Sequence, residues 1–485
     1  MKIWKKIAQT LMCVVVLAGS VIHAREITWD EMNGSVFSLN RSGKYEEAIE
    51  VAHMALQLAE KKNGSEHPDV ALSLSSLAEL HYLKGDYTQA EIFYEQALTV
   101  DEKALGKEHQ VVAIDLNNLG FIYFSQGKLD KAESLYKRAL AIDEKESNKD
   151  KNLLVATDLD NLGGLYLEQR RFDDAEIVFN RALKIREKVF GRKHQDVAIS
   201  LNNLAGLHHA RHQDKKAETL FKQALAMNET VLGEDHPATA MAKGNLAEFY
   251  FSQGKYSEAE LLYQQTLVID EKAFSKEHQK VATDLSNLAE VYVAQKNFLE
   301  AEGLFKKALA IREKTLGENH LHTALSLNSL ASLYFDQEKY SQAEPLCKRV
   351  LQIEGKILGK NHPDVATTLS NLAELYFLLG KLNEAESLCR QAMTINKKTF
   401  GENYPASALD KSMLGKIYVQ QGKYHEAELY LQQALSTLEK INGSDHPDVA
   451  IVLGDMSVLY YKTGRDELAA SMRKRAGTIR DNSFK

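Results

Sequence analysis

Apolar and polar positions follow one another along most of the chain with the period of an amphipathic α-helix. In one typical stretch the apolar positions fall at i, i+3, i+4 and i+7, and they are Leu116, Leu119, Gly120 and Tyr123. Gly127 and Lys128 then predict a turn, after which a second stripe of the same kind runs through residues 132–142. The pattern predicts two antiparallel helices joined by a short turn, and therefore an all-α fold.

The same two-helix pattern recurs along the chain at a fixed step. An alanine of the second stripe marks each copy, and successive copies lie 42 residues apart except for one step of 43: Ala48, Ala90, Ala132, Ala175, Ala217, Ala259, Ala301, Ala343, Ala385, Ala427 and Ala469. The extra residue falls in an unusual linker at residues 146–153. Because one helical hairpin cannot bury its apolar stripe alone, we predict a solenoid whose stacked units share a continuous core.

Small residues occupy one column of the first helices, where they would let two helices approach closely: Ala78, Gly120, Gly163, Ala205, Ala247, Ala289, Ala331, Ala373 and Gly415. We predict an N-terminal capping repeat at residues 25–64, the main array at residues 65–465, and a C-terminal capping helix and tail at residues 466–485. Gly34 lies in the middle of the first segment of the capping repeat and argues against a regular helix there.

Residues 1–24 have the layout of a secretory signal peptide. Lys2, Lys5 and Lys6 precede an apolar stretch at residues 7–19, and Ala24 offers a small residue before a cleavage point. The apolar stretch is short for a membrane-spanning helix, which needs about 20 apolar residues. We expect an exported protein, periplasmic or secreted. The alternative is an uncleaved anchor that holds the array outside the inner membrane.

Composition excludes several classes of protein. With 44% hydrophobic and 26% charged residues the chain is not intrinsically disordered, and 3 Cys in 485 residues do not make a disulfide scaffold. The net charge is −7 and the basic residues are scattered rather than gathered in one domain, which argues against nucleic acid as a partner. A membrane is a partner only if residues 1–24 are retained.

Recurring histidines suggest metal binding but fit the repeat better. One histidine marks the linker of most units: His67, His109, His194, His236, His278, His320, His362 and His446. Neighbouring helix axes lie about 8–10 Å apart, so equivalent residues cannot share an ion, and we predict that they cap or pack helix starts. His208 and His212 share a helix face, but no acid or cysteine completes a metal site.

The remaining reactive residues give no catalytic pattern. Cys347 and Cys389 lie one repeat apart, beyond the roughly 7 Å limit for a disulfide, and are predicted to be buried free thiols. Motifs of known catalytic sites are missing from the sequence. We therefore predict no enzyme activity, no metal and no cofactor. An active site assembled from scattered groove residues is the alternative.

The spacing of small, aromatic and alanine positions resembles the tetratricopeptide repeat, as in Gly120, Tyr123 and Ala132. The 42-residue step and the sequences at residues 362–366 and 371–376 resemble the kinesin light chain type. The resemblance implies a right-handed superhelix of antiparallel helix pairs, whose first helices line a concave groove for an extended peptide or a partner helix. The long heptad segment that would recruit a motor is missing, so only the fold and the groove are carried over.

One column of the first helices is rich in asparagine. Six of its ten positions are Asn118, Asn161, Asn203, Asn245, Asn287 and Asn371. Asparagine is a poor helix former, and its donor and acceptor together suit the amide groups of a peptide. The resemblance implies the same role, contact with the ligand backbone. The alternative is that these side chains brace neighbouring helices.

Two further columns complete the predicted groove. Six residues after the asparagine column come aromatic residues, among them Phe124, Phe251, Phe335 and Phe377, whose alternative role is packing between units. A third column holds the acidic residues Glu79, Glu248, Glu290 and Glu374.

We predict a non-catalytic scaffold that binds a neutral or basic extended segment of a protein partner. A membrane-anchored envelope assembly factor and a secreted host-protein-binding effector remain as alternatives.

Overall fold

The computed structural model describes residues 28–41, 44–145, 152–401 and 405–483, and the regular elements in these ranges are all α-helices. The prediction of an all-α fold is confirmed. The first helices of the successive units are α2 (Trp29–Arg41), α4 (Pro68–Leu83), α6 (Gln110–Ser125), α8 (Leu153–Glu168), α10 (Gln195–Ala210), α12 (Pro237–Ser252), α14 (Gln279–Ala294), α16 (Leu321–Asp336), α18 (Pro363–Leu378), α20 (Pro405–Gln420) and α22 (Pro447–Lys462).

Each first helix is followed by a second, antiparallel helix of the same unit. These are α3 (Tyr45–Asn63), α5 (Tyr87–Leu105), α7 (Leu129–Asp143), α9 (Phe172–Phe190), α11 (Asp214–Leu232), α13 (Tyr256–Ala273), α15 (Phe298–Leu316), α17 (Tyr340–Ile357), α19 (Leu382–Phe400), α21 (Tyr424–Asn442) and α23 (Asp466–Ser483). The helix α2 runs unbroken through Gly34, so the expectation of irregular structure there was wrong. The proposed signal segment lies outside the described residues.

The linker histidines begin the first helices. In all eight cases the imidazole accepts a hydrogen bond from the backbone N–H two residues further on, as His67 does from Asp69 at 3.2 Å. One otherwise unpaired N–H of the helix start is thereby satisfied. The prediction that these histidines cap helices is confirmed.

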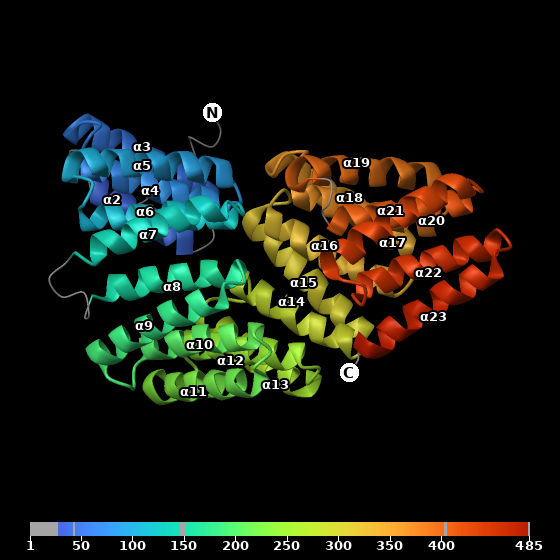
Figure 1. Cartoon of the computed structure of the whole chain (residues 1–485). Helices are drawn as coiled ribbons and strands as arrows, with labels where there is room; N and C mark the ends of the chain where they lie inside the picture. Colours follow the sequence, from blue (N-terminus) through green and yellow to red (C-terminus); the bar gives the residue numbers. More distant parts are fainter. Residues whose placement is uncertain (1–27, 42–43, 146–151, 402–404, 484–485) are drawn as a thin grey trace.

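The units stack in two layers that curve into a superhelix (Figure 1). Each first helix packs on its own second helix and on the second helix of the preceding unit. Successive first helices, such as α8 and α10 or α20 and α22, also contact each other and approach more closely than successive second helices do. The layer with the closer spacing lies on the inside of a curve. The first helices therefore form the concave face.

Glycine in the small-residue column permits the closest approach between two helices of one unit. A Cβ atom added to Gly163 would lie 2.3 Å from the ring of Phe179, and one added to Gly120 would lie 2.7 Å from the ring of Tyr136. Gly164, the next residue of the same helix, has open space at its Cβ position. The large aromatic side chain of the second helix thus takes the place that a side chain on the first helix would need.

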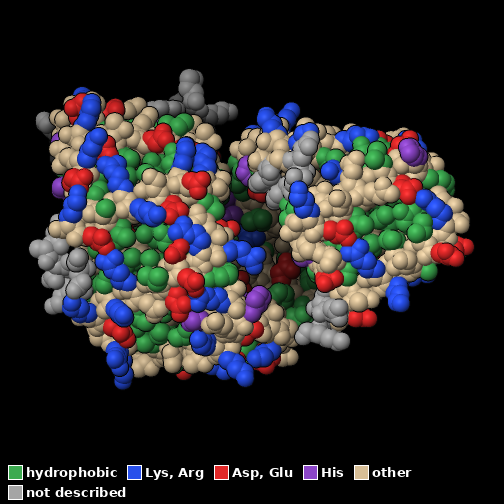
Figure 2. Space-filling view, in the orientation of Figure 1, with side chains coloured by type: hydrophobic (Ala, Val, Ile, Leu, Met, Phe, Trp, Pro, Cys, Tyr) green, Lys and Arg blue, Asp and Glu red, His purple; other side chains and the backbone are tan. Residues whose placement is uncertain are grey.

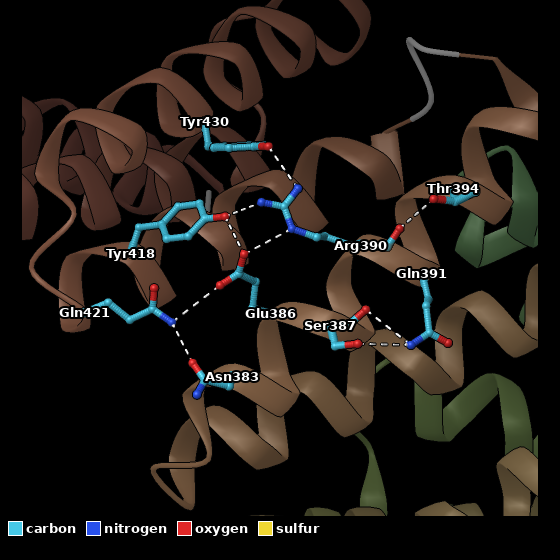
Figure 3. Close-up of polar contacts among 9 residues, drawn as sticks. All are labelled: Asn383, Glu386, Ser387, Arg390, Gln391, Thr394, Tyr418, Gln421 and Tyr430. Carbon is cyan, nitrogen blue, oxygen red and sulfur yellow. Dashed lines mark hydrogen bonds and ion pairs between the residues drawn. The ribbon is translucent and has the colours of Figure 1, made fainter.

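A polar clamp joins each second helix to the following unit. Figure 3 shows it between α19 and the next unit, where Glu386 accepts hydrogen bonds from Tyr418 at 2.8 Å and Gln421 at 3.5 Å. Arg390, one turn after Glu386 on α19, donates to the same carboxylate at 3.1 Å and also reaches Tyr430 of the next second helix.

Equivalent glutamates repeat the clamp along the array. Glu302 accepts from Tyr334 at 2.9 Å and Glu344 from Lys381 at 2.7 Å. Hydrogen bonds from Lys348 and Lys381 lower the pKa of Glu344. From α5 to α21 a glutamate at this position contacts side chains of the following unit and fixes its register, whereas α3 has Ile49 there.

Two distant parts of the superhelix touch at a seam, which we define as Leu83 and Gly85 on one side and His320 and Leu321 on the other. The ring Nδ1 of His320 accepts from the backbone N–H of His322, so its Nε2 carries the proton and donates to the Leu83 carbonyl at 2.8 Å. The Leu321 side chain lies against Gly85. The end of α4 and the start of α16, six units apart, therefore meet across one turn of the spiral (Figure 1).

The seam buries His320, which is 3% exposed, and this burial lowers its pKa to about 4. The imidazole is therefore neutral at physiological pH. Further along the same junction, a cavity of about 550 Å³ separates α2 and α3 from the α13–α14 linker and α15, with Tyr45, Phe274 and Lys314 in its wall. The two turns are therefore not in continuous contact along this junction.

We predict opposite effects of alanine at two adjacent glycines. Gly163→Ala should destabilise the fold by about 1–3 kcal/mol because its methyl group overlaps Phe179. Gly164→Ala should stabilise it by about 0.5–1 kcal/mol, since it adds helix propensity in open space. Urea unfolding followed by circular dichroism measures both. Equal effects of the two changes would contradict the close packing described for Gly163.

We also predict that the seam holds the pitch of the spiral. Leu321→Asp should increase the radius of gyration measured by small-angle X-ray scattering, because a carboxylate replaces the methyl groups packed against Gly85. An acidic residue is favourable in the first turn of a helix, so α16 itself should persist. The matched control is Gln195→Asp, the same position of α10 away from the seam. An unchanged radius for both variants would show that the seam does not set the pitch.

Candidate functional site

The three predicted columns lie in parallel rows on the concave face. The asparagines form the middle row, the acidic column lies one turn further along each first helix, and the aromatic column follows it. A small cavity of about 170 Å³ brings one member of each row together, because Phe335, Asn371 and Glu374 all line it. In the space-filling view a hollow separates the two halves of the molecule, and hydrophobic and acidic side chains lie on its wall (Figure 2).

The asparagine row divides into two groups. Asn161 donates to Asn117 of the preceding unit at 3.2 Å, and Asn117 in turn donates to Asp158 at 2.5 Å. Asn203 lies beside Asp160 of the preceding unit and counteracts the rise that burial causes in the pKa of that carboxyl group. These asparagines brace neighbouring helices, as the alternative interpretation had it.

The other four asparagines are Asn118, Asn245, Asn287 and Asn371. Their side-chain amides make no hydrogen bond within the described part of the chain, and all four are at least partly exposed. A side-chain amide that faces the groove without an internal partner can donate to and accept from a ligand backbone. Bracing is therefore excluded as the role of these four side chains in the structure, and peptide binding remains a prediction for them.

The aromatic row is mainly a packing feature. Phe251 lies 5.6 Å from Tyr256, and Phe335 lies 5.5 Å from Tyr340, as measured between ring centroids. Phe124 and Phe377 each pack against the apolar core of their own part of the array. Each ring keeps part of its surface exposed, so the row forms the apolar floor at one edge of the groove.

The acidic row is open to solvent at its centre. Glu248 and Glu290 are exposed on α12 and α14. Asp455 takes the asparagine position on α22, where burial raises its pKa to about 6 and Ser412 donates a hydrogen bond at 2.8 Å. The concave face therefore carries negative charge along the C-terminal half of the first helices.

A fourth row escaped the sequence analysis. Four residues before each asparagine position, the first helices carry an uncharged side chain that is exposed in most units. The apolar members that are at least 40% exposed are Leu72, Ile114, Ile199, Met241, Leu325 and Ile451. The other positions of the row are Thr157, Thr283, Thr367 and Leu409. An alignment of the units by their 42-residue step is enough to identify this column, because it shows apolar residues recurring outside the core stripe.

Beneath the groove, polar side chains are buried at most junctions between a second helix and the next first helix, whereas the α21–α22 junction has Leu438 and Val452 at the equivalent positions. Asp101 and Asp115 are 3% and 4% exposed, and their carboxyl groups lie close enough to interact, which favours a proton on one of them. Burial and the charge of Asp101 raise the pKa of Asp115 to about 8. At the equivalent junction of α19 and α20, Asn396 donates to Asp410 at 3.2 Å and no shared proton is needed.

Other residues that suggest chemistry are structural. His208 is buried at a core position and contacts Gln213, and Cys347 and Cys389 are buried free thiols as predicted. Burial raises the pKa of Cys389 to about 12, which keeps it an unreactive thiol. Over the described ranges the side chains form no cluster of three or more potential metal ligands. Among the helices in those ranges, none is long and apolar enough to span a bilayer.

The stacked helix pairs and their concave face define an α-solenoid. The tetratricopeptide repeat family model matches overlapping segments over most of the chain, at residues 32–103, 77–145, 153–230, 196–272, 280–353, 326–398, 364–440 and 412–481. The chain therefore belongs to the tetratricopeptide repeat family. Repeats of this family form protein–protein interaction scaffolds that bind other proteins or peptides and are typically non-catalytic. A search of the curated proteins found no match.

Several solved structures are similar to parts of the chain. The nearly identical TPR-like repeats of a kinesin light chain candidate from Podosopora anserina are 29% identical, with 42% of this chain and 97% of that one covered and a TM-score of 0.39. BtubC (BKLC) from P. vanneervenii is 25% identical, with 50% and 92% covered and a TM-score of 0.38. The apo form of RapI is 20% identical, with 59% and 98% covered and a TM-score of 0.41.

We predict that the buried acid pair weakens the fold as the pH rises. The unfolded chain releases the proton near pH 4, whereas folded Asp115 holds it to about pH 8, so stability is lost progressively between these values. Asp101→Asn recreates the Asn396–Asp410 pair and should raise the free energy of unfolding at pH 8 by about 1 kcal/mol or more, with little change at pH 5. Urea titrations at both pH values test this, with Asp130→Asn at an exposed position as the control. A gain of equal size at both pH values would contradict the shared proton.

Proposed function

We propose that this protein is an exported, non-catalytic scaffold whose concave groove holds an extended segment of a partner protein. The observation that carries the proposal is the row of partner-free asparagines on the concave face, at Asn118, Asn245, Asn287 and Asn371. An extended peptide leaves its backbone amides unpaired, and side-chain amides in a row can pair with them without reading its sequence. Binding of this kind needs neither a metal nor a cofactor.

The charge of the groove favours neutral or basic ligands. Glu79, Glu248, Glu290 and Glu374 recur in one row, where Lys416 is the single basic residue. An acidic segment would meet like charges at these four positions, whereas a basic one would meet opposite charges. The same acidity argues against nucleic acid as a ligand of this face.

Export rests on the sequence of residues 1–24. Its basic start, short apolar stretch and small residue at Ala24 support a cleaved signal peptide. The envelope-anchored alternative keeps this segment, and N-terminal sequencing of the mature protein separates the two. A secreted effector that binds a host protein differs from a periplasmic scaffold only in destination, which fractionation of the source cells would determine.

The experiment that tests groove binding is affinity capture from the envelope fraction of the source cell. Asn245, Asn287 and Asn371 are replaced together by alanine, and Gln223, Gln391 and Gln433, exposed on second helices, are replaced in the control. We expect the partner retained by the wild type and by the control to be lost from the asparagine variant, with unchanged circular dichroism in all three. Equal capture by the asparagine variant would rule out the groove as the binding surface.

A further inference from the structure

The exposed apolar row on the concave face has an unusual composition for a solvent-facing helix position. Charged residues make up 26% of the chain, yet none of the ten positions in this row is charged. Seven are apolar and three are threonine. Leu325 is 59% exposed and Met241 is 44% exposed, so burial in the core does not explain them.

Exposed apolar side chains on the second helices follow a different pattern. Leu261 on α13 and Leu299 on α15 are 57% and 80% exposed, but the column of Leu261 also contains Ser134, Thr219 and Ser387. Isolated apolar residues on a surface are normal and call for no ligand. The Leu261 column is likewise uncharged from α5 to α23, but its large aliphatic members are only four, Ile92, Ile177, Leu261 and Leu429. The concave row has seven aliphatic or methionine side chains over the same ten units and is therefore the more continuous apolar surface.

The three rows have a fixed order along each first helix. The apolar row lies four residues before the asparagine row and the acidic row three residues after it, which at the rise of an α-helix is about 6 Å and about 4.5 Å. A segment that lies over the asparagine row crosses the first helices one after another. Its side chains then point along the helices, toward the apolar row on one side and the acidic row on the other.

An extended chain directs successive side chains to opposite sides. From this geometry we infer that the groove selects a protein segment in which apolar and basic residues alternate. The inference rests on the proposed function and adds the side-chain pattern that the partner must carry. The apolar residues of the bound segment cover Met241, Leu325 and their equivalents, while its lysine or arginine residues face Glu248 and Glu290. The Asn245 and Asn287 amides pair with the backbone between them.

Isothermal titration of the intact protein with four synthetic peptides tests the inference. The first alternates valine with lysine, the second alternates valine with glutamate, and the third alternates serine with lysine. The fourth has the composition of the first with its valines and lysines in two blocks. We expect the first peptide to bind about tenfold or more tightly than each of the others, since only it satisfies all three rows at once.

Two double variants test which row of the groove is responsible for each part of the peptide preference. Met241→Ser with Leu325→Ser should weaken binding of the valine–lysine peptide about tenfold and leave the serine–lysine peptide unchanged. Glu248→Gln with Glu290→Gln should remove the discrimination between the lysine and glutamate peptides. The controls on the second helices are Leu261→Ser with Leu299→Ser, and Glu258→Gln with Glu300→Gln, which should bind like the wild type.

The possible results separate this inference from the proposed function. If the valine–lysine peptide binds no more tightly than the other three, or if none of the four binds, the alternating pattern is wrong. If the second-helix controls lose binding as the groove variants do, the rows are not the ligand surface. The proposed function itself is tested by the three-asparagine variant in the capture experiment, whose outcome does not depend on the peptides.

Discussion

Each helix pair of this protein can bury its apolar face only against the pair before and after it, and the rest of the structure follows from that constraint. Small residues are required wherever the two helices of a unit cross closely, as Gly163 and Phe179 show. Equal spacing of the units then aligns equivalent residues into rows on the concave face. The candidate binding surface is thus a direct product of the packing that makes the fold stable.

Polar contacts between neighbouring units fix the register in which the units stack. The glutamate clamp joins each unit to the next through tyrosine, glutamine and basic side chains, and it is similar in Glu302, Glu344 and Glu386. The buried pairs beneath the groove vary much more, since one junction holds Asp101 with Asp115 and another holds Asn396 with Asp410. A buried polar group is tolerated when a partner satisfies it. The Asp101–Asp115 pair needs a carboxyl proton for this, whereas in the Asn396–Asp410 pair the asparagine amide supplies the hydrogen. The array is therefore uniform in shape but not in its response to pH.

Much of the fold could be predicted from the sequence because it depends on local periodicity. The helix pairs, the capping histidines and the buried cysteines all follow from the positions of residues within the 42-residue step. The seam could not be predicted, because contact between Leu83 and His320 depends on the pitch that accumulates over six units. A change of a few degrees per unit would place other residues opposite each other.

The sequence predicts only in part which asparagines of the row brace neighbouring helices and which have no partner. An asparagine braces the array when the preceding unit offers an acceptor in the adjacent column, as Asn117 does for Asn161. For Asn287 that position is Gly244, which has no side chain and so cannot accept such a bond. Comparing two neighbouring columns, rather than one, would have identified Asn287 as free. For Asn245 and Asn371 the neighbouring residues have polar side chains, so only the structure shows that no bond forms.

The seam closes one turn of the superhelix, because the end of α4 and the start of α16 contact each other there. A closed turn cannot change its curvature unless this contact breaks, so the units between α4 and α16 keep their curvature together. In the part of the chain that the structure describes, the helices α19 to α23 pack mainly against their immediate neighbours in the chain. The curvature of these last units can therefore vary without breaking the seam, and the two parts of the array differ in stiffness.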